Sequence, residues 1–452
     1  MRLAIALLLS ASALSAQYKS VNPKVREIVD AVDQKRVETI LRKLETFETR
    51  FILSGDSKPS RGIAAAREWI HAELKSYSPR LEVRFEVHKV KKDARRIAKD
   101  TDIVNVIAIL PGKTRPESHV YVTGHYDSMT LGSRRDDDTG ETPAASDPDI
   151  AAPGVSDDGS GTAVTMELAR VMSQHEFDKT LVFAAFAGEE VGLIGSRLHA
   201  DAAKAKKRNI EAVFNNDIVG NDVAGNGARD NSTVRVFSGD PADSLSRQVA
   251  RYVKDMSDRY YPAMRVEPVF RADRFGRAGD HTAFADAGFG AVRFTTPSEN
   301  YANQHTATDT FANASAPYTT RVAKVNAAAA ASLALAPRPP VVNTTVESGA
   351  RKGQLATLLG RGKSRYDAQL KWKYPEPEAD LAGFAVVVRS TLAPFWEREV
   401  YAGNVLEYTM PDVSIDNLVF GVKAIDRDGN ESLVSAYTLT VRAFPRPETQ
   451  KP

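Results

Sequence analysis

The sequence predicts an α/β fold, with a mostly parallel or mixed central sheet flanked by helices, followed by a separate all-β sandwich. Three observations lead to this prediction. Short apolar runs of strand length alternate with amphipathic helical segments over most of the chain, which is typical of a covered, largely parallel sheet. The proline-rich segment Pro337–Pro340 ends this alternation. Beyond it, short strands and turn residues follow one another without a helical pattern.

Changes in composition divide the chain into segments. We predict a signal peptide at 1–16, a first domain at 17–336, a linker at 337–345, a β-sandwich domain at 346–445 and a tail at 446–452. The first segment has one basic residue, an apolar core and a tail of small residues, which is the layout of a secretory signal. We therefore expect an exported protein, periplasmic or extracellular. No later apolar run approaches the length of a transmembrane helix, so we expect no stable membrane insertion.

The elements of the first domain follow from apolar spacing. The predicted helices are Lys24–Glu48, Gly62–Lys75, Gly159–Gln174, Leu193–Lys207, Pro241–Ser257, Asp280–Asp286 and Tyr318–Leu335. The predicted strands are Leu81–His88, Asp102–Leu110, His119–Gly124, Leu181–Ala185, Ala212–Asp217, Thr233–Phe237 and Ala291–Phe294. The polar, acidic segment Ser133–Pro153 is predicted to be a long loop.

The C-terminal segment has the pattern of a β-sandwich. The predicted strands are Leu370–Tyr374, Ala385–Ser390, Glu397–Tyr401 and Val419–Ile425. Asp428-Gly429-Asn430 is a strong hairpin-turn signal. Together with Trp372, these features resemble a fibronectin type III domain, which implies an immunoglobulin-like sandwich. Such a domain is a candidate for contact with a polymer or a cell surface, and we expect it to carry no catalysis.

Composition limits the function. The 452 residues include 60 Lys and Arg and 58 Asp and Glu, for a net charge of +2. This balance predicts no nucleic-acid partner. The chain contains no cysteine, so any metal site must be built from His, Asp and Glu.

Paired carboxylates follow the predicted strand Leu181–Ala185. Glu189 and Glu190 stand after Gly188, where a tight turn leads towards the next helix. Two acidic residues at the end of a buried strand are costly unless each has a partner or a metal. Taken alone, the pair is explained better by an acidic helix start, which the helix dipole favours.

Other strand ends and helix starts also carry side chains that bind metals. His125 and Asp127 follow a strand at a spacing that lets the carboxylate contact the imidazole. Asp157 and Asp158 precede a helix, where a cap would explain one carboxylate better than two. The remaining candidates are Asp217 after a strand, His305 with Asp309 in a loop, and, as supporting residues, Asp280 and His281 at a helix start. Jointly they supply the ligands for two zinc ions about 3.5–4 Å apart that share a carboxylate and a water.

Five ordered motifs now point to a family. GHYDS, PGVSDDGSG, FAGEEVGLIGS, NNDIVG and QHTATDT resemble the co-catalytic zinc exopeptidases. These include secreted bacterial leucyl aminopeptidases and glutamate carboxypeptidase-like enzymes. The resemblance covers residues 23–336 and implies two Zn²⁺ per chain and a peptide or protein substrate with a free N-terminus.

The resemblance also implies a role for each residue. His125 and Asp217 would bind one zinc ion, Glu190 and His305 the other, and Asp157 both. Glu189 would be the general base that takes a proton from a zinc-activated bridging water as that water attacks the scissile carbonyl. Asp127 would orient His125, and Asp158 would follow Asp157 across a cis peptide bond.

One position departs from the family pattern. Many relatives have a tyrosine directly before the last ligand histidine, where it stabilises the oxyanion. Here that position is Gln304, with Tyr301 three residues earlier, and both are candidates for the role.

Three alternatives to an aminopeptidase follow from the same motifs. A carboxypeptidase or dipeptidase would need a basic pocket, which Arg271, Arg274 and Arg277 could supply. A glutaminyl-cyclase-like transferase would use one zinc ion, against the paired ligand set. A catalytically inactive binding protein would have lost a ligand or the base, and neither is lost.

Overall fold

The computed structural model describes residues 21–54, 60–93, 96–131, 150–349, 352–353, 355–364 and 366–438. The predicted signal peptide and tail, and most of the predicted loop Ser133–Pro153, lie outside these residues. The chain divides into two compact units, one of residues 21–335 and one that begins at Ala336. The boundary adjoins the proline-rich segment.

A mixed eight-stranded sheet forms the centre of the first unit, in the order β1-β2-β4-β3-β5-β8-β6-β7. Its strands are β1 (Glu82–Val90), β2 (Thr101–Leu110), β3 (Arg115–His125), β4 (Lys179–Phe186), β5 (Asn209–Asn216), β6 (Thr233–Phe237), β7 (Arg265–Val269) and β8 (Ala291–Thr295). The four central strands β4, β3, β5 and β8 run parallel to one another. β1 and β2 join one side and β6 the other in antiparallel pairs. The α/β fold with a mixed, helix-flanked sheet is therefore confirmed.

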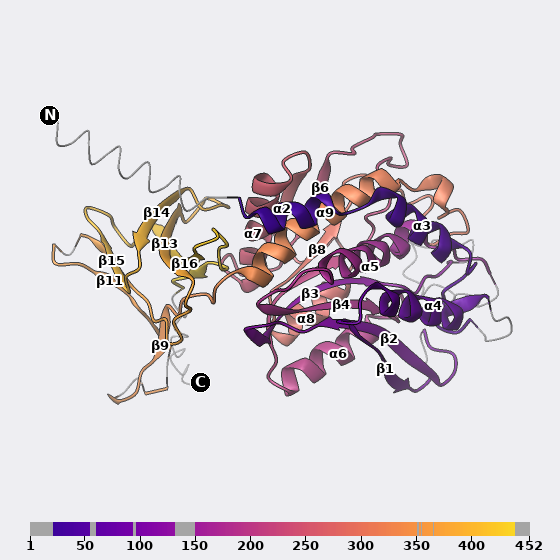
Figure 1. The fold of residues 1–452 in the computed structure, drawn as a ribbon, viewed down its shortest axis with the longest axis horizontal. Coiled ribbons are helices and arrows are strands. Elements are labelled where there is room, and N and C mark those ends of the chain that lie inside the picture. Colours follow the sequence, from indigo (N-terminus) through magenta and orange to yellow (C-terminus); the bar gives the residue numbers. More distant parts are fainter. Residues whose placement is uncertain are drawn as a thin grey trace, which may run out of the picture. The chain divides into compact units, whose positions relative to one another are not determined.

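Helices cover both faces of this sheet (Figure 1). They are α2 (Pro23–Asp30), α3 (Gln34–Glu45), α4 (Gly62–Tyr77), α5 (Ser160–Met172), α6 (Ile194–Ala205), α7 (Leu245–Tyr260), α8 (Asp280–Ala287) and α9 (Ala316–Leu335). α5 and α9 pack on β3 and β4 from one side, and α2, α3 and α7 pack on α9. α6 and α8 contact each other on the opposite face.

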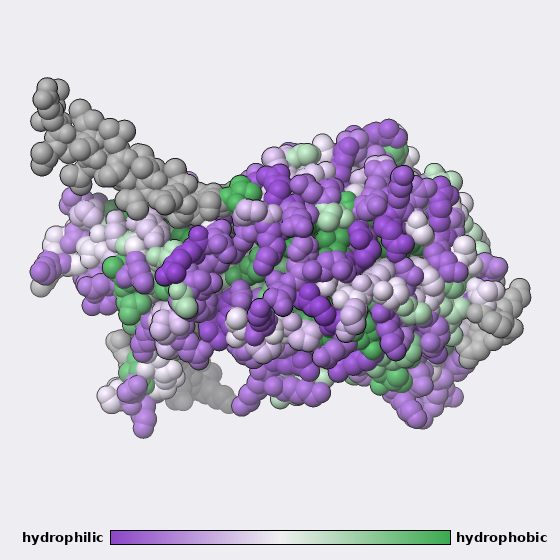
Figure 2. All heavy atoms as spheres, in the orientation of Figure 1, coloured by the Kyte–Doolittle hydropathy of each residue, from purple (hydrophilic) through white to green (hydrophobic). Residues whose placement is uncertain are grey.

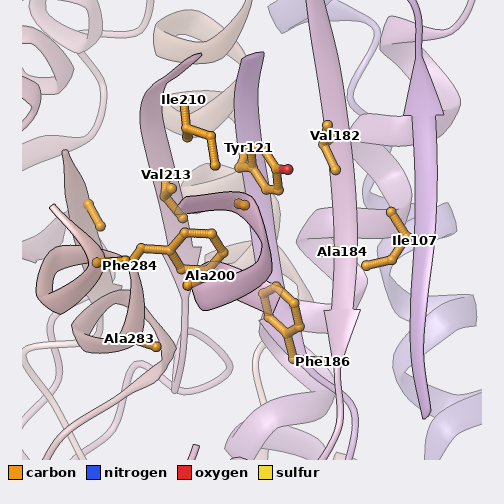
Figure 3. Close-up of a cluster of buried hydrophobic side chains, with 13 residues drawn as sticks. Ile107, Tyr121, Val182, Ala184, Phe186, Ala200, Ile210, Val213, Ala283 and Phe284 are labelled. Atoms are coloured by element: carbon orange, nitrogen blue, oxygen red, sulfur yellow. The ribbon is translucent and has the colours of Figure 1, made fainter. Parts of the chain in front are cut away.

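Apolar side chains fill the space between the sheet and the α6–α8 pair (Figure 3). Phe284 of α8 lies 5.8 Å from Phe186 at the end of β4, measured between ring centroids, and 5.7 Å from Tyr121 of β3. Burial of rings of this size is a large part of what holds helices on a sheet. This packing holds α8 against Tyr121 within β3 and against the end of β4, and candidate site residues lie at the carboxyl ends of these two strands.

Two element predictions for this unit were inaccurate. The predicted helix Lys24–Glu48 is two helices, because the side chain of Asp33 accepts a hydrogen bond from the backbone N–H of Lys35 and so begins α3 separately. β7 was not predicted. Its sequence, RVEPV, contains Pro268, which weakens a strand signal but is tolerated at the edge of a sheet, where β7 lies.

The second unit is all-β. Its strands are β9 (Asn343–Thr345), β10 (Leu355–Thr357), β11 (Leu359–Arg361), β12 (Ala368–Lys371), β13 (Leu381–Ser390), β14 (Arg398–Gly403), β15 (Glu407–Met410), β16 (Leu418–Asp426) and β17 (Ser435–Ala436). They form sheets of two, three and four strands. One apolar cluster, which includes Leu370 and Phe384, takes side chains from both larger sheets. The predicted turn at Asp428-Gly429-Asn430 is present, with the N–H of Gly429 donating to the carbonyl of Asp426.

Figure 2 shows hydrophilic residues over most of the visible surface of each unit, with hydrophobic residues in small separate patches. Among the described helices, none has the length and hydropathy needed to cross a membrane.

Candidate metal centre

The candidate residues meet because three neighbouring parallel strands end at one edge of the sheet. His125 is the last residue of β3 and pairs in register with Phe186, the last residue of β4. Glu189 and Glu190 follow β4, and Asp217 directly follows β5. The carboxyl ends of parallel strands are where ligands bind in α/β folds. The topology therefore brings together side chains that are far apart in sequence.

Two side chains hold the turn that carries the paired glutamates. The amide of Asn105 accepts from the N–H of Ala187 at 3.1 Å and donates to the carbonyl of Gly195 at 3.1 Å. The carboxylate of Asp127 accepts from the N–H groups of Glu189 and Glu190 at 3.3 and 3.2 Å. Asp127 thus does more than the sequence predicted, since it also positions the β4 turn. Nδ1 of His125 lies 3.2 Å from the Asp127 carbonyl and 3.5 Å from its carboxylate.

Asp157 and Asp158 lie in the short kinked segment η1 (Val155–Gly159), before α5, and the backbone of both residues is outside the helical region. The peptide bond between them is cis, as predicted. The carboxylate of Asp158 is buried and accepts from the N–H groups of His125, Gly161 and Ile218. A Cβ at Gly161 would lie 2.1 Å from the carbonyl oxygen of Asn216, so only glycine fits there. Asp158 therefore ties the ends of β3 and β5 to the start of α5.

Asp157 stands between the two histidines. Its Oδ1 is 3.3 Å from Nε2 of His125, and its Oδ2 is 3.0 Å from Nε2 of His305. Nε2 of His305 is also 3.0 Å from Oε2 of Glu190, while Nε2 of His125 is 3.9 Å from Oδ1 of Asp217. Each oxygen of Asp157 faces one histidine, which is the arrangement that a shared carboxylate ligand needs.

His305 reaches the centre from a loop rather than from the sheet. Its φ is +55°, a left-handed conformation, and its carbonyl accepts from the N–H of Leu131 at 3.0 Å. The same loop supplies Asp309, whose carboxylate accepts from the N–H groups of Ser156 and Asp157 at 2.9 and 3.0 Å. One loop therefore provides a candidate ligand and fixes the backbone of another.

The sequence did not single out Arg293 or Asp273. Arg293 is fully buried on β8, with Nη2 3.0 Å from Oδ1 of Asp217 and Nη1 2.8 Å from Oδ1 of Asp273. Burial alone would lower the pKa of this guanidinium, but Asp217 and Asp273 raise it. A charged residue inside the apolar strand AVRFT was the available signal, because a buried arginine needs an acidic partner.

Arg50 was also missed, and nothing in its neighbourhood of the sequence marked it. It is fully buried, and its guanidinium donates to the carbonyls of Tyr126 at 2.6 Å and Gly154 at 2.8 Å. Arg50 thus links the backbone at Tyr126, next to His125, to the backbone at Gly154, three residues before Asp157. Burial lowers the pKa of Arg50 to about 10, although the negative charges of Asp309 and Asp127 act to raise it.

Burial and mutual repulsion shift the acidity of the centre. Burial raises the pKa of Glu189 well above its usual value, with His125 opposing this effect and Asp217 reinforcing it. Burial likewise raises the pKa of Glu190 and, more strongly, that of Asp158. For His125, burial alone would lower the pKa, but the surrounding carboxylates, Glu189 foremost, raise it well above its usual value. Carboxylates crowded at this density need positive charge close by.

The donor set fits zinc. Ligand atoms lie within 4.8 Å of one another in two groups, His125 with Glu189 and Asp217, and His125 with Asp157 and Glu190. Nε2 of His125 and Oε1 of Glu190 are buried, and no described residue makes a well-oriented hydrogen bond to either atom. Imidazole and carboxylate groups are zinc ligands in proteins, and buried atoms without partners are what a metal ion would satisfy.

Of the two supporting candidates, Asp280 is buried at the start of α8, and burial raises its pKa to about 7 against the effect of His125. Nε2 of His281 lies 2.7 Å from the carbonyl oxygen of Ala272. Neither residue belongs to the two ligand groups found among the described residues.

The centre opens into a cleft of about 400 Å³. Apolar side chains line part of it, and four arginines, Arg96, Arg197, Arg274 and Arg277, line another part. Every acidic residue among the described lining residues is a candidate for the metal centre or its base. Arg271 is not among the lining residues and instead lies 4.2 Å from the ring of Phe275.

The two oxyanion candidates are placed differently. Tyr301 is 47% exposed and is not among the residues that line the cleft. Gln304 is buried, and its Nε2 donates to Oδ2 of Asp157 at 2.8 Å. Gln304 therefore contacts the centre directly.

Comparisons with known proteins identify the family of this chain. Residues 105–330 match the model of peptidase family M28. A probable zinc metalloprotease of Pyricularia oryzae is 37% identical over 438 residues, covering 89% of this chain and 82% of the relative. The chain belongs to peptidase family M28. A probable zinc metalloprotease of Leptosphaeria maculans is 35% identical and covers 90% of this chain and 95% of the relative. This M28 chain is thus a zinc metallopeptidase.

Solved structures share the fold. The aminopeptidase LapA of Legionella pneumophila aligns with a TM-score of 0.53 and 19% identity, covering 71% of this chain and 77% of that chain. An aminopeptidase from Aneurinibacillus sp. strain AM-1 aligns with a TM-score of 0.50 and 18% identity, and the alignment covers 70% of this chain and 97% of that chain. At this identity the likeness shows that this M28 protein has the fold of these enzymes.

Proposed function

We propose that the protein is an exported aminopeptidase that uses two zinc ions. The observation that carries the proposal is the position of Asp157, whose two carboxylate oxygens each face a different histidine. A carboxylate in this position is suited to two cations rather than one. The aminopeptidases that share the fold support the choice of reaction.

In this proposal His125 and Asp217 would hold one ion, Glu190 and His305 would hold the other, and Asp157 would be shared between them. When bound, zinc supplies Lewis acidity that polarises a carbonyl and makes a water acidic near neutral pH.

The side chains of the chain itself handle protons and geometry. Glu189 accepts a proton from the attacking water and donates it to the amine that leaves. Its elevated pKa suits a group that must hold a proton for part of the cycle. Asp127 keeps Glu189 in place through the N–H of that residue and orients His125. A hydrogen-bond donor such as Tyr301 or Gln304 could stabilise the oxyanion only if it turned from its present contacts towards the cleft.

We further propose that the N-terminal segment is a cleaved signal and that the C-terminal unit is a fibronectin type III-like domain. The apolar cluster shared by its two larger sheets supports this assignment. Contact with a polymer or a cell surface is the role that we expect of this unit. Substrates are peptides or proteins with a free N-terminus.

One observation favours a second candidate, a carboxypeptidase or dipeptidase. Arg274 and Arg277 line the cleft together with Arg96 and Arg197, so cations are available for a terminal carboxylate. Arg274 and Arg277 already pair with Glu299, at 2.5 and 3.6 Å, which reduces their availability. We therefore rank this candidate second.

A substrate panel distinguishes the two. The purified protein, loaded with zinc, is assayed on aminoacyl-p-nitroanilides, on their N-acetylated counterparts and on N-blocked peptides with a free carboxylate. We expect cleavage of the free-amine substrates alone, and loss of that cleavage with a chelator. Cleavage of the N-blocked peptides alone would establish the carboxypeptidase, and metal binding without turnover on any substrate would indicate a binding protein.

A further inference from the structure

The side chain of Gln304 joins two groups of opposite hydrogen-bonding character. Its Nε2 donates to Oδ2 of Asp157 at 2.8 Å, and its Oε1 accepts from Nη1 of Arg277 at 3.1 Å. The residue is 6% exposed, so water has little access to replace either bond. None of the roles assigned to the metal ligands or to the general base accounts for these contacts.

The chemistry of the neighbours explains why an amide stands here. An ionised carboxylate only accepts hydrogen bonds, and a guanidinium only donates them. An amide satisfies both with a single orientation. A carboxylate at position 304 would face Asp157 and repel it, and an ammonium group would face Arg277. The orientation of the Gln304 amide is therefore determined by its two partners.

Arg277 is itself held in place. Its Nη1 lies 3.6 Å from Oε2 of Glu299, and its guanidinium lies 5.9 Å from the ring centroid of Tyr301. A continuous set of contacts thus runs from Glu299 through Arg277 and Gln304 to Asp157. It links the wall of the cleft to the carboxylate that stands between the two histidines.

Asp217 and Asp157, the two aspartates near Nε2 of His125, have supporting partners of different charge. Asp217 pairs directly with the guanidinium of Arg293 at 3.0 Å, which neutralises much of its charge. Asp157 contacts His125, His305 and the neutral amide of Gln304. A neutral donor orients a carboxylate and leaves its charge for cations, and partners of this kind contribute to metal affinity.

We propose that Gln304, oriented by Arg277, is a positioning residue for Asp157 and sets the metal affinity of the centre. The proposal rests on the metal centre of the proposed function and is independent of which end of a peptide is cleaved. Gln304 acts through Asp157 in this role and needs no contact with substrate.

The test measures metal affinity and kinetics on the full chain. Dissociation constants for Zn²⁺ are obtained by competition with a chromophoric chelator. Gln304→Met should weaken the looser zinc ion about tenfold and lower kcat with little change in KM, since outer partners of metal ligands typically contribute about 10–100-fold. Gln304→Leu should weaken zinc binding by a similar factor, because it also removes the amide N–H that orients Asp157.

Arg277→Met tests the link through the amide. In the wild-type background, Arg277→Met should weaken zinc binding by a smaller factor than Gln304→Met does. In the Gln304→Met background, adding Arg277→Met should cause no additional loss of zinc affinity. Asn303→Ala is the matched control, because Asn303 lies in the same loop and accepts from Thr308 at 3.0 Å without a described contact to Asp157. This control should retain wild-type affinity.

Two results would overturn the proposal. One is unchanged zinc affinity in both Gln304 variants. The other is an equal loss of affinity in Asn303→Ala, which would assign the effect to the loop in general. Additive losses for Arg277→Met and Gln304→Met would remove Arg277 from the mechanism. Because zinc affinity is measured without substrate, these results stand even if the peptide panel refutes the aminopeptidase.

Discussion

Both units bury charged side chains, and they balance these charges in different ways. In the C-terminal unit, the amine of Lys423 lies between Glu399, at 3.0 Å, and Glu431. Its positive charge is shared by two carboxylates, and Glu399 keeps 18% of its side chain exposed. In the N-terminal unit, five carboxylates lie around only three cationic side chains, those of His125, His305 and Arg293. The carboxylates are those of Asp157, Asp158, Glu189, Glu190 and Asp217.

The ratio of buried carboxylates to buried cations distinguishes the ion cluster around Lys423, which is structural, from the candidate metal centre. A buried ion pair satisfies itself, and its loss is felt as lost stability. A surplus of buried carboxylates is satisfied only when cations bind, so its loss is felt as lost metal and lost activity. The predictions below change one unit at a time, from the largest expected effect to the smallest.

Glu189→Gln should remove activity and keep the metal. Loss of the proton-transfer group typically costs about 10²–10⁴-fold in kcat. Zinc content, measured by atomic absorption, should stay at the wild-type value, because the five proposed ligands remain. A variant that loses zinc together with activity would instead make Glu189 a ligand, a role that its place in one of the two ligand groups allows.

Lys423→Met should destabilise the C-terminal unit by about 3–5 kcal/mol, since it leaves two glutamates without their cation. Urea unfolding of the full chain, followed by tryptophan fluorescence, measures this loss. Lys371→Met is the matched control, because Lys371 and Glu407 form an exposed pair, 49% and 63% exposed, whose contribution should stay below about 1 kcal/mol. Similar losses in both variants would argue against a special role for the buried cluster. Peptidase activity at 25 °C should be unaffected by either variant.

Metal removal should destabilise only the N-terminal unit. A ligand present at about a hundred times its dissociation constant adds about 2.7 kcal/mol to the stability of the state that binds it. Calorimetry with and without a chelator should therefore shift one transition and leave the other in place. A shift of the C-terminal transition would show that the stability of the two units is coupled.

Acid should stabilise the C-terminal unit through Asp426. Burial raises the pKa of Asp426 to about 6, although hydrogen bonds from Asn430 act in the opposite direction. The folded unit thus binds a proton more tightly than the unfolded chain does, so its stability should rise by up to about 2 kcal/mol as the pH falls from 7 to 4.

Asp426→Asn removes the titrating group and should abolish this gain. The free energy of unfolding of the C-terminal transition, measured by urea titration at several pH values, provides the comparison. An unchanged slope in the variant would assign the pH dependence to other groups.

The motifs of the sequence predicted much of the candidate centre. Short apolar strands followed by His125, Glu190 and Asp217 mark the edge of a parallel sheet, and the structure brings these residues together. The tandem pair of aspartates and the His305 loop also lie where the motifs predicted. Periodicity was less reliable for the helix at Lys24–Glu48, because a single side-chain cap divides it, and for β7, because a proline weakens its signal.

The sequence by itself determined the fold class, the ligand candidates and their order along the chain, because each depends on local patterns of apolar and metal-binding residues. Apart from Asp127 and Asp158, which belong to the motifs, the tertiary structure alone decided which side chains support the ligand candidates. Arg50, Arg293 and Gln304 come from distant segments, and their partners are chosen by the packing of strand ends and loops. The role of a buried guanidinium or amide depends on the groups to which it donates or from which it accepts hydrogen bonds, and no local sequence pattern specifies those groups.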